Sequence, residues 1–374
     1  MVSVARKNLF QEKTRLFISV GGVAFAVTLI LILQGLYQGW NSRITAYMES
    51  IDADFWVSQK GSADLSHSVS LVPKDLESAI KATDGVKAVN QFIGRQIAFK
   101  IDDEEANFFL VGFDTDENVG GPVKMAKGKS VPDDGEIIVD TVFAKNKKVK
   151  IGDRLTLNNR GFEIIGLSEG GNMVVYQYAF VKKEEAEKVF GMDGEGGKIA
   201  LTNYFLVKAE PGKVFQAKES LEKNLTENTV KTREDFLDEN KKLIRESFLP
   251  IIMILNLVAF FIGVALIGLT IYTATVEKAQ EFGVLKAIGA SNWKLFKIIF
   301  EQGFISAVIG YFIGVGLTFA LLKVITNIVP AFTTEIRLVD LAFVLLAAVL
   351  MSIFAAYIPI RKVMRIDPAR VFRA

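Results

Sequence analysis

The sequence contains no cysteine and a single histidine, and these scarcities exclude several kinds of site. Without cysteine there is no disulfide bond, thiolate nucleophile or thiolate metal ligand. We interpret His67, which lies among serines, as a solvated loop residue. A phosphate-binding loop is also missing, because Gly128-Lys129-Ser130 lacks the glycine that the motif requires five positions earlier, where Val123 stands. We therefore predict a chain with no catalytic residues, no metal site and no bound cofactor of its own.

Charged residues are missing from four long windows, 16–42, 247–276, 302–322 and 341–360. Each window supplies the roughly 20 apolar residues that cross a bilayer core. The alternative for a single window is a buried core helix, and for the first window it is a cleaved signal peptide. The first apolar run is long and no small-residue cleavage site follows Leu33, which favours a retained span.

These windows predict a membrane protein with one N-terminal span, three C-terminal spans and a large α+β domain inserted between the first and second spans. The expected order is an interfacial helix 1–15, span 16–40, extracytoplasmic domain with helical stalk 41–248, span 249–276, connecting helix 277–291, span 292–323, external loop 324–340, span 341–360 and tail 361–374.

Basic residues gather near the span ends in a way that predicts orientation. Clusters of Lys and Arg precede the first span, separate the second from the third, and follow the fourth. Residues 41–248 carry 29 basic and 35 acidic side chains, whereas the remainder carries 15 and 7. The positive-inside rule places the three basic clusters, and both termini, in the cytoplasm. The basic excess is thus a topology signal and does not indicate nucleic-acid binding.

Alternating apolar residues and turn signals predict the secondary structure of the inserted domain. The expected strands are 86–101, 107–113, 136–140, 154–157, 162–167, 173–181 and 203–209, and the expected helices are 73–83, 183–190 and 214–225. From Glu234 a helical pattern has no breaker before Pro250, so we expect a stalk that runs into the second span and is kinked at Pro250. The acidic run 102–105 is expected to be a solvated hairpin turn. Two sets of glycines in the spans, Gly35 with Gly39 and Gly310 with Gly314 and Gly316, are expected to allow close helix approach.

A short charged segment between the second and third spans is the best candidate functional site. Phe282, Leu285 and Ile288 recur at three-residue spacing, while Lys278, Glu281 and Lys286 are charged, which predicts an amphipathic surface helix. Gly289 suits the C-terminus of this helix, and Ser291 can cap the next one.

The segment Glu281–Ala290, EFGVLKAIGA, resembles the run after the second span in FtsX/MacB-like permeases of ABC transporters. Residues 134–140 with 149–156 resemble the periplasmic core domain of that family, and 358–362 with 366–372 resemble its C-terminal tail. The N-terminal part, 11–17, 23–27 and 52–54, is similar to the DevC-like branch, whose exporters work with an adaptor protein. The resemblance covers essentially the whole chain.

The resemblance implies a multi-pass subunit of the bacterial cytoplasmic membrane that forms a homodimer and binds two cytoplasmic ABC ATPase subunits. ATP and Mg are then expected on the ATPase, which must be a separate chain because nucleotide-binding motifs are missing here. The helix after the second span would be the coupling helix. Its implied ATPase-coupling residues are Glu277, Glu281, Phe282, Gly283, Leu285, Lys286, Ile288 and Gly289, with Phe282, Leu285 and Ile288 filling a groove on the ATPase.

Two functions fit this expectation. In the first, movement of the external domain exports a hydrophobic or amphipathic substrate, such as a lipid, haem, peptide or drug. The spans carry no ionisable residue at mid-membrane depth, which argues against an ion-driven transporter. In the second, the same movement regulates an external hydrolase or signals to a sensor kinase, as in FtsX-like mechanotransmission.

Overall fold

The computed structural model describes residues 12–62, 64–65, 68–171, 176–328 and 332–364. His67, most of the expected interfacial helix and most of the C-terminal tail lie outside these residues. The chain forms two compact units. One, the helical unit, combines the chain up to Gly39 with the chain from Ser247 onward, and the other, the inserted domain, runs from Trp40 to Glu246.

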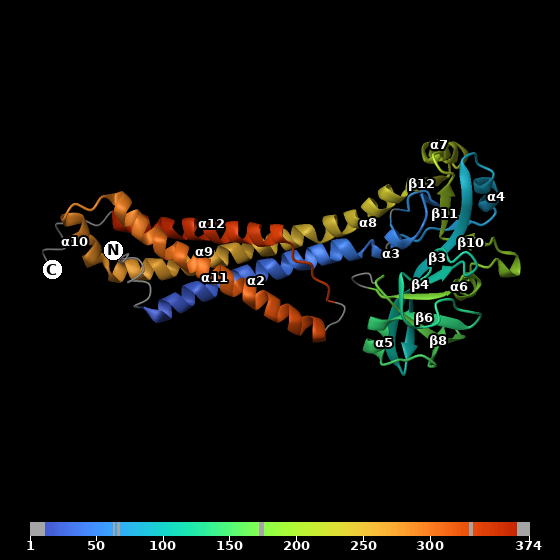
Figure 1. The fold of residues 1–374 in the computed structure, drawn as a ribbon, viewed down its shortest axis with the longest axis horizontal. Helices are drawn as coiled ribbons and strands as arrows, with labels where there is room; N and C mark the ends of the chain where they lie inside the picture. Colours follow the sequence, from blue (N-terminus) through green and yellow to red (C-terminus); the bar gives the residue numbers. More distant parts are fainter. Residues whose placement is uncertain (1–11, 63, 66–67, 172–175, 329–331, 365–374) are drawn as a thin grey trace. The chain divides into compact units, whose positions relative to one another are not determined.

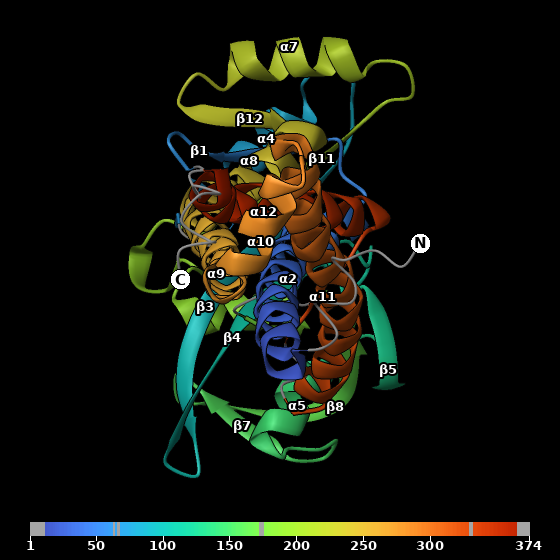
Figure 2. The same cartoon turned by 90° about the vertical axis from the view of Figure 1, so that its left-hand side faces the viewer.

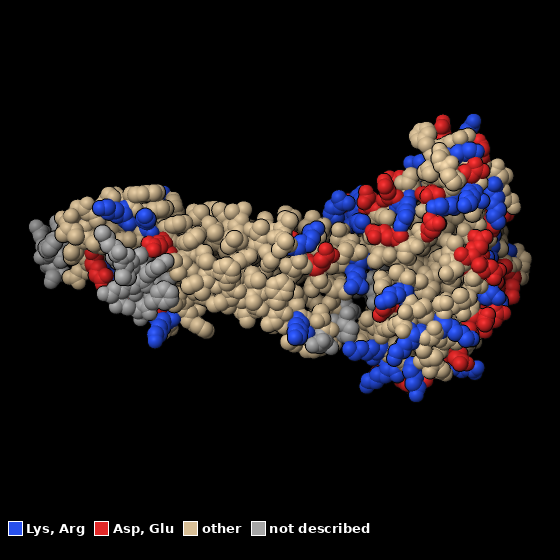
Figure 3. Space-filling model, viewed as in Figure 1, with Lys and Arg blue, Asp and Glu red and all other residues tan. Residues whose placement is uncertain are grey.

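Four described helices of the helical unit are long and apolar enough to cross a membrane. They are α2 (Lys13–Arg43), α9 (Leu249–Glu277), α11 (Asn292–Ile328) and α12 (Leu338–Met364). Figure 2 shows them nearly end-on, with α2 between α9 and α11. On the face drawn in Figure 3, the acidic and basic side chains of this unit lie toward its ends and the middle shows none. The four-span prediction is confirmed.

Small residues allow α11 to approach α2 closely. A Cβ atom added at Gly310 would lie 2.6 Å from Cβ of Val23, and one at Gly314 would lie 2.8 Å from the carbonyl oxygen of Ala24. Thr28 Oγ1 donates a hydrogen bond to the Gly314 carbonyl at 3.1 Å. Gly316, by contrast, faces open space. Gly310 and Gly314 therefore form the predicted contact surface, whereas our expectation that Gly316 belongs to it is wrong.

The segment 333–335, which is neither helix nor strand, packs against the Gly35–Gly39 pair of α2 in place of another helix. A Cβ atom at Gly39 would lie 2.4 Å from the Thr333 carbonyl oxygen, and the backbone amide of Glu335 donates to the Gly35 carbonyl at 2.9 Å. Our expectation of a helix–helix contact at this pair is therefore wrong. Glycine spacing predicts a flat helix surface, but it does not say which backbone packs there.

The inserted domain is built on a ten-stranded sheet with the strand order β12-β1-β11-β3-β4-β9-β6-β8-β5, with β7 added beside β8. A second sheet pairs β2 (Val72–Pro73) with β10 (Leu201–Thr202). The main strands are β1 (Phe55–Gln59), β3 (Val86–Ile101), β4 (Glu104–Phe113), β5 (Lys124–Gly128), β6 (Glu136–Asp140), β7 (Arg154–Leu157), β8 (Arg160–Glu169), β9 (Tyr178–Lys182), β11 (Tyr204–Ala209) and β12 (Asn228–Thr232). The helices are α3 (Ala46–Ser50), α4 (Leu76–Lys81), α5 (Thr141–Lys147), α6 (Lys183–Phe190), α7 (Val214–Asn224) and α8 (Arg233–Ser247), with a 3-10 turn at Glu195–Gly197.

The long strand β3 joins two halves of the sheet, each with its own core. Its first half pairs with β11 and its second half with β4 (Figure 1). One core lies beneath α4 and α7 and contains Phe55 and Phe205, and the other lies beneath α5 and α6 and contains Phe108 and Phe162. The α+β prediction is confirmed. Five strands were not predicted, namely β1, β5 and β12 of the main sheet and the two short strands β2 and β10.

Two chain connections join the inserted domain to the helical unit. The first runs from α2 through α3 to β1, and the second runs from β12 through α8 to α9. We expected one continuous helix kinked at Pro250. Instead α8 ends at Ser247 and α9 begins at Leu249, with Pro250 in its first turn. Proline is well tolerated there because the first-turn amides have no partner within the helix.

Candidate functional site

The connection between α9 and α11 contains a separate short helix, α10 (Ala279–Ala287). The chain reverses after it through Gly289, which has φ +93°, a value that glycine adopts without strain. The amide of Ala290 donates to the Leu285 carbonyl at 2.9 Å and that of Gly289 to the Lys286 carbonyl at 3.0 Å. This pair of bonds is a Schellman motif. Ser291 then caps α11 by accepting a hydrogen bond from the Lys294 amide at 3.4 Å.

One face of α10 is exposed and carries apolar side chains. Val284 is 42% exposed and Ile288 is 76% exposed, and the charged residue Glu281 is exposed on the same face. These positions are separated by three and four residues, so they form one stripe along the helix. The stripe, Glu281, Val284 and Ile288, is referred to below as the outer face of α10. It offers apolar contact area with a charge at one end.

The opposite face of α10 packs against the helical unit. Phe282 is 5% exposed and belongs to the same core as Leu295 and Ile299, and Leu285 packs against that core while remaining partly exposed. Gly283 is also buried. The resemblance implied that Phe282, Leu285 and Ile288 together fill a groove on the ATPase, but here Phe282 is buried in the core of this chain and Ile288 is exposed. Each three-residue step falls about 60° short of a full turn, so Phe282 and Ile288 lie on different sides of the helix.

Two of the three charged candidates, Lys286 and Glu277, make contacts within the chain. Lys286 Nζ donates to the carbonyl oxygen of Met364 at 2.7 Å, at the C-terminus of α12, where a cation is favoured by the helix dipole. Glu277 is the last residue of α9 and pairs with Arg15 at the start of α2. Both residues therefore fasten α10 and its junction to neighbouring helices.

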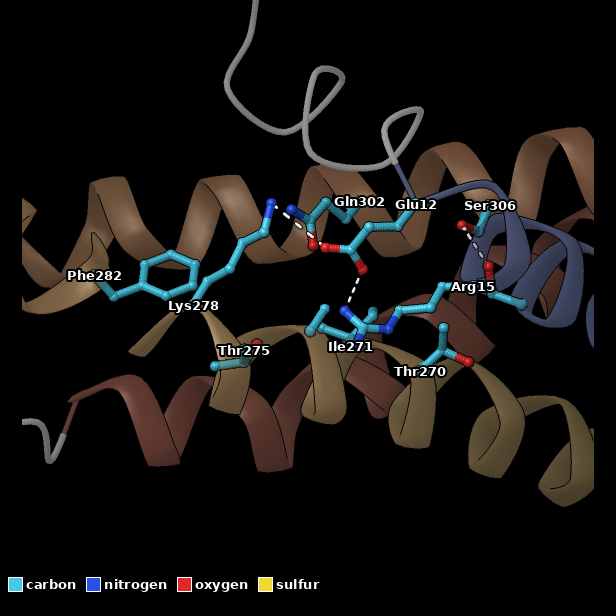
Figure 4. A pocket seen from close by; sticks show the side chains of 11 residues that line it. Glu12, Arg15, Thr270, Ile271, Thr275, Lys278, Phe282, Gln302 and Ser306 are labelled. Atoms are coloured by element: carbon cyan, nitrogen blue, oxygen red, sulfur yellow. Dashed lines mark hydrogen bonds and ion pairs between the residues drawn. The ribbon is translucent and has the colours of Figure 1, made fainter. Parts of the chain in front are cut away.

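A polar pocket lies behind α10, among α2, α9 and α11 (Figure 4). Arg15 forms ion pairs with both Glu12 and Glu277, and Lys278 Nζ lies 3.5 Å from Glu12 Oε1. Deeper in the pocket, the Ser19 hydroxyl donates to the Ser306 hydroxyl at 3.2 Å. The cavity volume is about 30 Å³, enough for a water molecule. The other lining residues are Thr270, Ile271, Ala274, Thr275, Phe282 and Gln302.

The sequence analysis did not identify Glu12, Arg15 or Val284 as site residues. Arg15 was interpreted only as one of several basic residues before the first span, and nothing local distinguishes it from Lys13. Its role depends on the position of Glu277, which is far away in sequence. Among the described residues, no group of three or more His, Cys, Asp or Glu side chains could hold a metal ion.

Comparison with known proteins matches two family models to this chain. Residues 16–224 match the model of the MacB-like periplasmic core domain, and residues 253–368 match that of the FtsX-like permease C-terminal region. The whole chain is 21% identical to an uncharacterized ABC transporter permease of Mycobacterium tuberculosis, of which it covers 99%. It is 22% identical to an uncharacterized ABC transporter permease of Methanocaldococcus jannaschii, of which it covers 97%.

Among solved structures, the periplasmic region of MacB from Actinobacillus actinomycetemcomitans matches 51% of this chain and 94% of that structure. The identity is 11% and the TM-score 0.36, so this match adds nothing to the family models. The two models together span both the helical unit and the inserted domain. The protein is thus a non-catalytic, multi-pass membrane protein with an extracellular domain, and a permease of this kind implies an ATPase partner. The chain belongs to the FtsX/MacB family of ABC transporter permeases.

Proposed function

We propose that the protein couples ATP hydrolysis by a separate cytoplasmic ATPase to movement of its inserted domain, and so exports a hydrophobic or amphipathic substrate. Two copies of the permease would form a homodimer with two ATPase subunits, which hold the ATP and Mg. An adaptor protein outside the membrane would complete an exporter of this kind. The observation that carries the proposal is the outer face of α10, an exposed apolar stripe on a short helix between two spans.

The distribution of charge supports a cytoplasmic position for α10. Its end of the helical unit includes Lys278, Lys286 and Lys294, and Arg361 and Lys362 lie in the last turn of α12. Basic residues near span ends favour the cytoplasmic side of a membrane. With α10 in the cytoplasm, Val284 and Ile288 are accessible to a cytoplasmic ATPase, and both chain termini lie on the same side.

The composition of the spans supports a substrate taken from the outer leaflet or from the external face. Windows 16–42, 247–276, 302–322 and 341–360 carry no charged residue, so the spans provide no charged path across the membrane. Mechanical work on the inserted domain does not require such a path. Lipids, haem, hydrophobic peptides and drugs are the classes of substrate that fit this route.

Substitution of Val284 tests the proposal with a matched control. Val284→Asp places a charge on the outer face of α10, where the residue is 42% exposed, so we expect loss of ATPase association and at least a tenfold loss of permease-stimulated hydrolysis. Val214→Asp makes the same change on α7, at 44% exposure, and should affect neither. Both variants are to be compared as full-length chains co-purified with the native ATPase. Normal association and stimulation with Val284→Asp would contradict the proposal.

The export function itself requires a different measurement. Mass spectrometry of the purified permease–ATPase complex should identify a co-purified lipid or small hydrophobic molecule whose amount falls when ATP is added. An external hydrolase or a sensor kinase found in the complex, with no such molecule, would favour the mechanotransmission function and would contradict export.

A further inference from the structure

Four charged side chains join the start of α2 to the junction between α9 and α10. Glu12 and Arg15 belong to the first described residues of the chain, Glu277 ends α9, and Lys278 precedes α10. Figure 4 shows Arg15 and Lys278 both directed toward Glu12. These four residues, Glu12, Arg15, Glu277 and Lys278, are called the charge clamp below.

The charge clamp connects the start of α10 to α2, a span that is not adjacent to α10 along the chain. α10 follows α9, which leads back through α8 to β12, at one edge of the sheet. α2 leads through α3 to β1, which pairs with both β12 and β11 inside the sheet. A displacement of α10 can therefore reach the inserted domain through α9 by covalent connection, but through α2 only by non-covalent contacts, among which the charge clamp lies next to α10.

We infer that Arg15 is a positioning residue that transmits the displacement of α10 to α2 through the charge clamp. This inference rests on the proposed coupling function. Arg15 uses its two terminal guanidinium nitrogens for different carboxylates, Nη1 for Glu12 and Nη2 for Glu277. A planar guanidinium bridges two carboxylates in a fixed geometry, which a lysine ammonium does not do. The clamp thus constrains direction as well as distance.

The degree of burial suits a contact that has to hold two moving helices. The side chains of Arg15, Glu12 and Lys278 are 24%, 28% and 17% exposed, whereas that of Glu277 is 62% exposed. Fully exposed pairs contribute little to stability, and fully buried charges are costly to desolvate. The adjacent cavity has room for water, which lets the clamp stay partly hydrated while its members are held in place.

Charge reversal at Arg15 provides the test, and the cysteine-free sequence makes it simple to read. A spin label on Phe215→Cys, a residue 83% exposed on α7, reports the distance between the two inserted domains of the dimer by pulsed electron paramagnetic resonance. The full-length permease with its native ATPase is measured without nucleotide and with ATP and vanadate. The variants, all on this background, are Arg15→Glu, Arg15→Lys, Arg15→Glu with Glu277→Arg, and Lys13→Glu.

We expect Arg15→Glu to retain ATPase association and ATP binding but to lose more than half of the nucleotide-dependent distance change. Arg15→Lys should lose a smaller part, and the swapped pair with Glu277→Arg should regain at least half of the loss. Lys13→Glu reverses a neighbouring exposed charge and should leave the change intact. If Arg15→Glu does not fold, Arg15→Lys, which keeps the charge, is compared with Lys13→Arg instead.

An unaltered distance change in both Arg15 variants would overturn the inference while leaving the coupling function in place. Loss of the change in Lys13→Glu to the same extent as in Arg15→Glu would also overturn it, because the effect would then be one of net charge. The absence of any nucleotide-dependent change in the parent protein would instead contradict the proposed function, and the inference with it.

Discussion

The two units of this chain bury apolar surface in different ways. In the inserted domain, large aromatic side chains interlock: Trp56 stacks on Phe236 with ring centroids 4.2 Å apart and contacts Phe92 and Tyr204 edge-on. In the helical unit, close contacts form where Gly310 and Gly314 meet α2. Lipid is as apolar as a leucine side chain, so helix association in a membrane depends on close packing more than on removal of apolar surface from water.

This difference indicates where movement is easiest. Interdigitated aromatic rings resist sliding, because each ring fills a fitted space. Flat glycine surfaces let helices contact closely without interlocking, and the helices of this unit are unequally covered. In the most hydrophobic stretch of α2, 56% of the residues are buried, against 22% for α9. We therefore expect the inserted domain to move as a body while the helices shift against one another.

The largest effect that separates the two kinds of packing is expected at Trp56. Trp56 is 1% exposed, and Trp56→Ala should destabilise the inserted domain by about 3–5 kcal/mol, because it leaves a cavity in the aromatic core. Trp293→Ala removes a tryptophan that is 71% exposed and should change stability far less. Pulse proteolysis of the full chain in urea and detergent measures both. Equal losses would mean that burial of large rings is not what stabilises this domain.

The next largest effect is expected at the helix contact of Gly310. Gly310→Leu forces atoms into the space occupied by Val23 and by the carbonyl oxygen of Val20, and overpacking of this kind costs about 1–3 kcal/mol or more. Gly316→Leu introduces the same side chain on the same helix, where nothing lies within 4 Å. The temperature at which the protein aggregates in detergent should fall for Gly310→Leu only. Matching shifts would show that helix propensity, and not the contact with α2, decides the outcome.

The smallest effect is expected at an exposed ion pair of the inserted domain. Lys208 Nζ lies 2.6 Å from Asp52 Oδ1, and this hydrogen bond lowers the pKa of Asp52. A lowered pKa means that the stabilisation is present above the ordinary pKa of an aspartate and is lost as pH falls through the lowered value. Since exposed pairs contribute about 0.2–1 kcal/mol, Lys208→Met should reduce stability slightly at pH 7. The difference in stability between Lys208→Met and the parent protein should vanish in acid. A difference that grows in acid would contradict a stabilising role for the Lys208–Asp52 ion pair.

The sequence predicted the elements whose signal is local. Charge-free windows predicted four spans, alternation predicted β3 and β7, and the β-branched run 137–139 after the Asp134-Gly135 turn predicted β6. Strand β5 was missed because Lys124, Lys127 and the glycine that ends it leave no apolar alternation on an edge strand. Strand β1 was missed for the opposite reason, since Phe55, Trp56 and Val57 are all buried and give no period of two.

The site was only partly predictable for reasons of geometry. Spacing predicted the helix α10, and Gly289 and Ser291 predicted its end and the start of α11. The orientation of the helix was not encoded locally, because Phe282 and Ile288 are both apolar and the core of the chain decides which of them is buried. The role of Arg15 could not be predicted from the local sequence, because the packing of α2 against α9 brings its partner Glu277 close to it.

Site-specific photo-crosslinking from the outer face of α10 tests most directly whether this face binds the ATPase. A photoreactive amino acid replaces Ile288, which is 76% exposed, and in a control chain it replaces Ile199, which is 70% exposed on the inserted domain. Binding of the ATPase to this face predicts a crosslink from position 288 to the ATPase subunit in intact membranes and none from position 199. A chain that crosslinks to the ATPase from 199, or that fails to do so from 288 while the complex remains assembled, would contradict it.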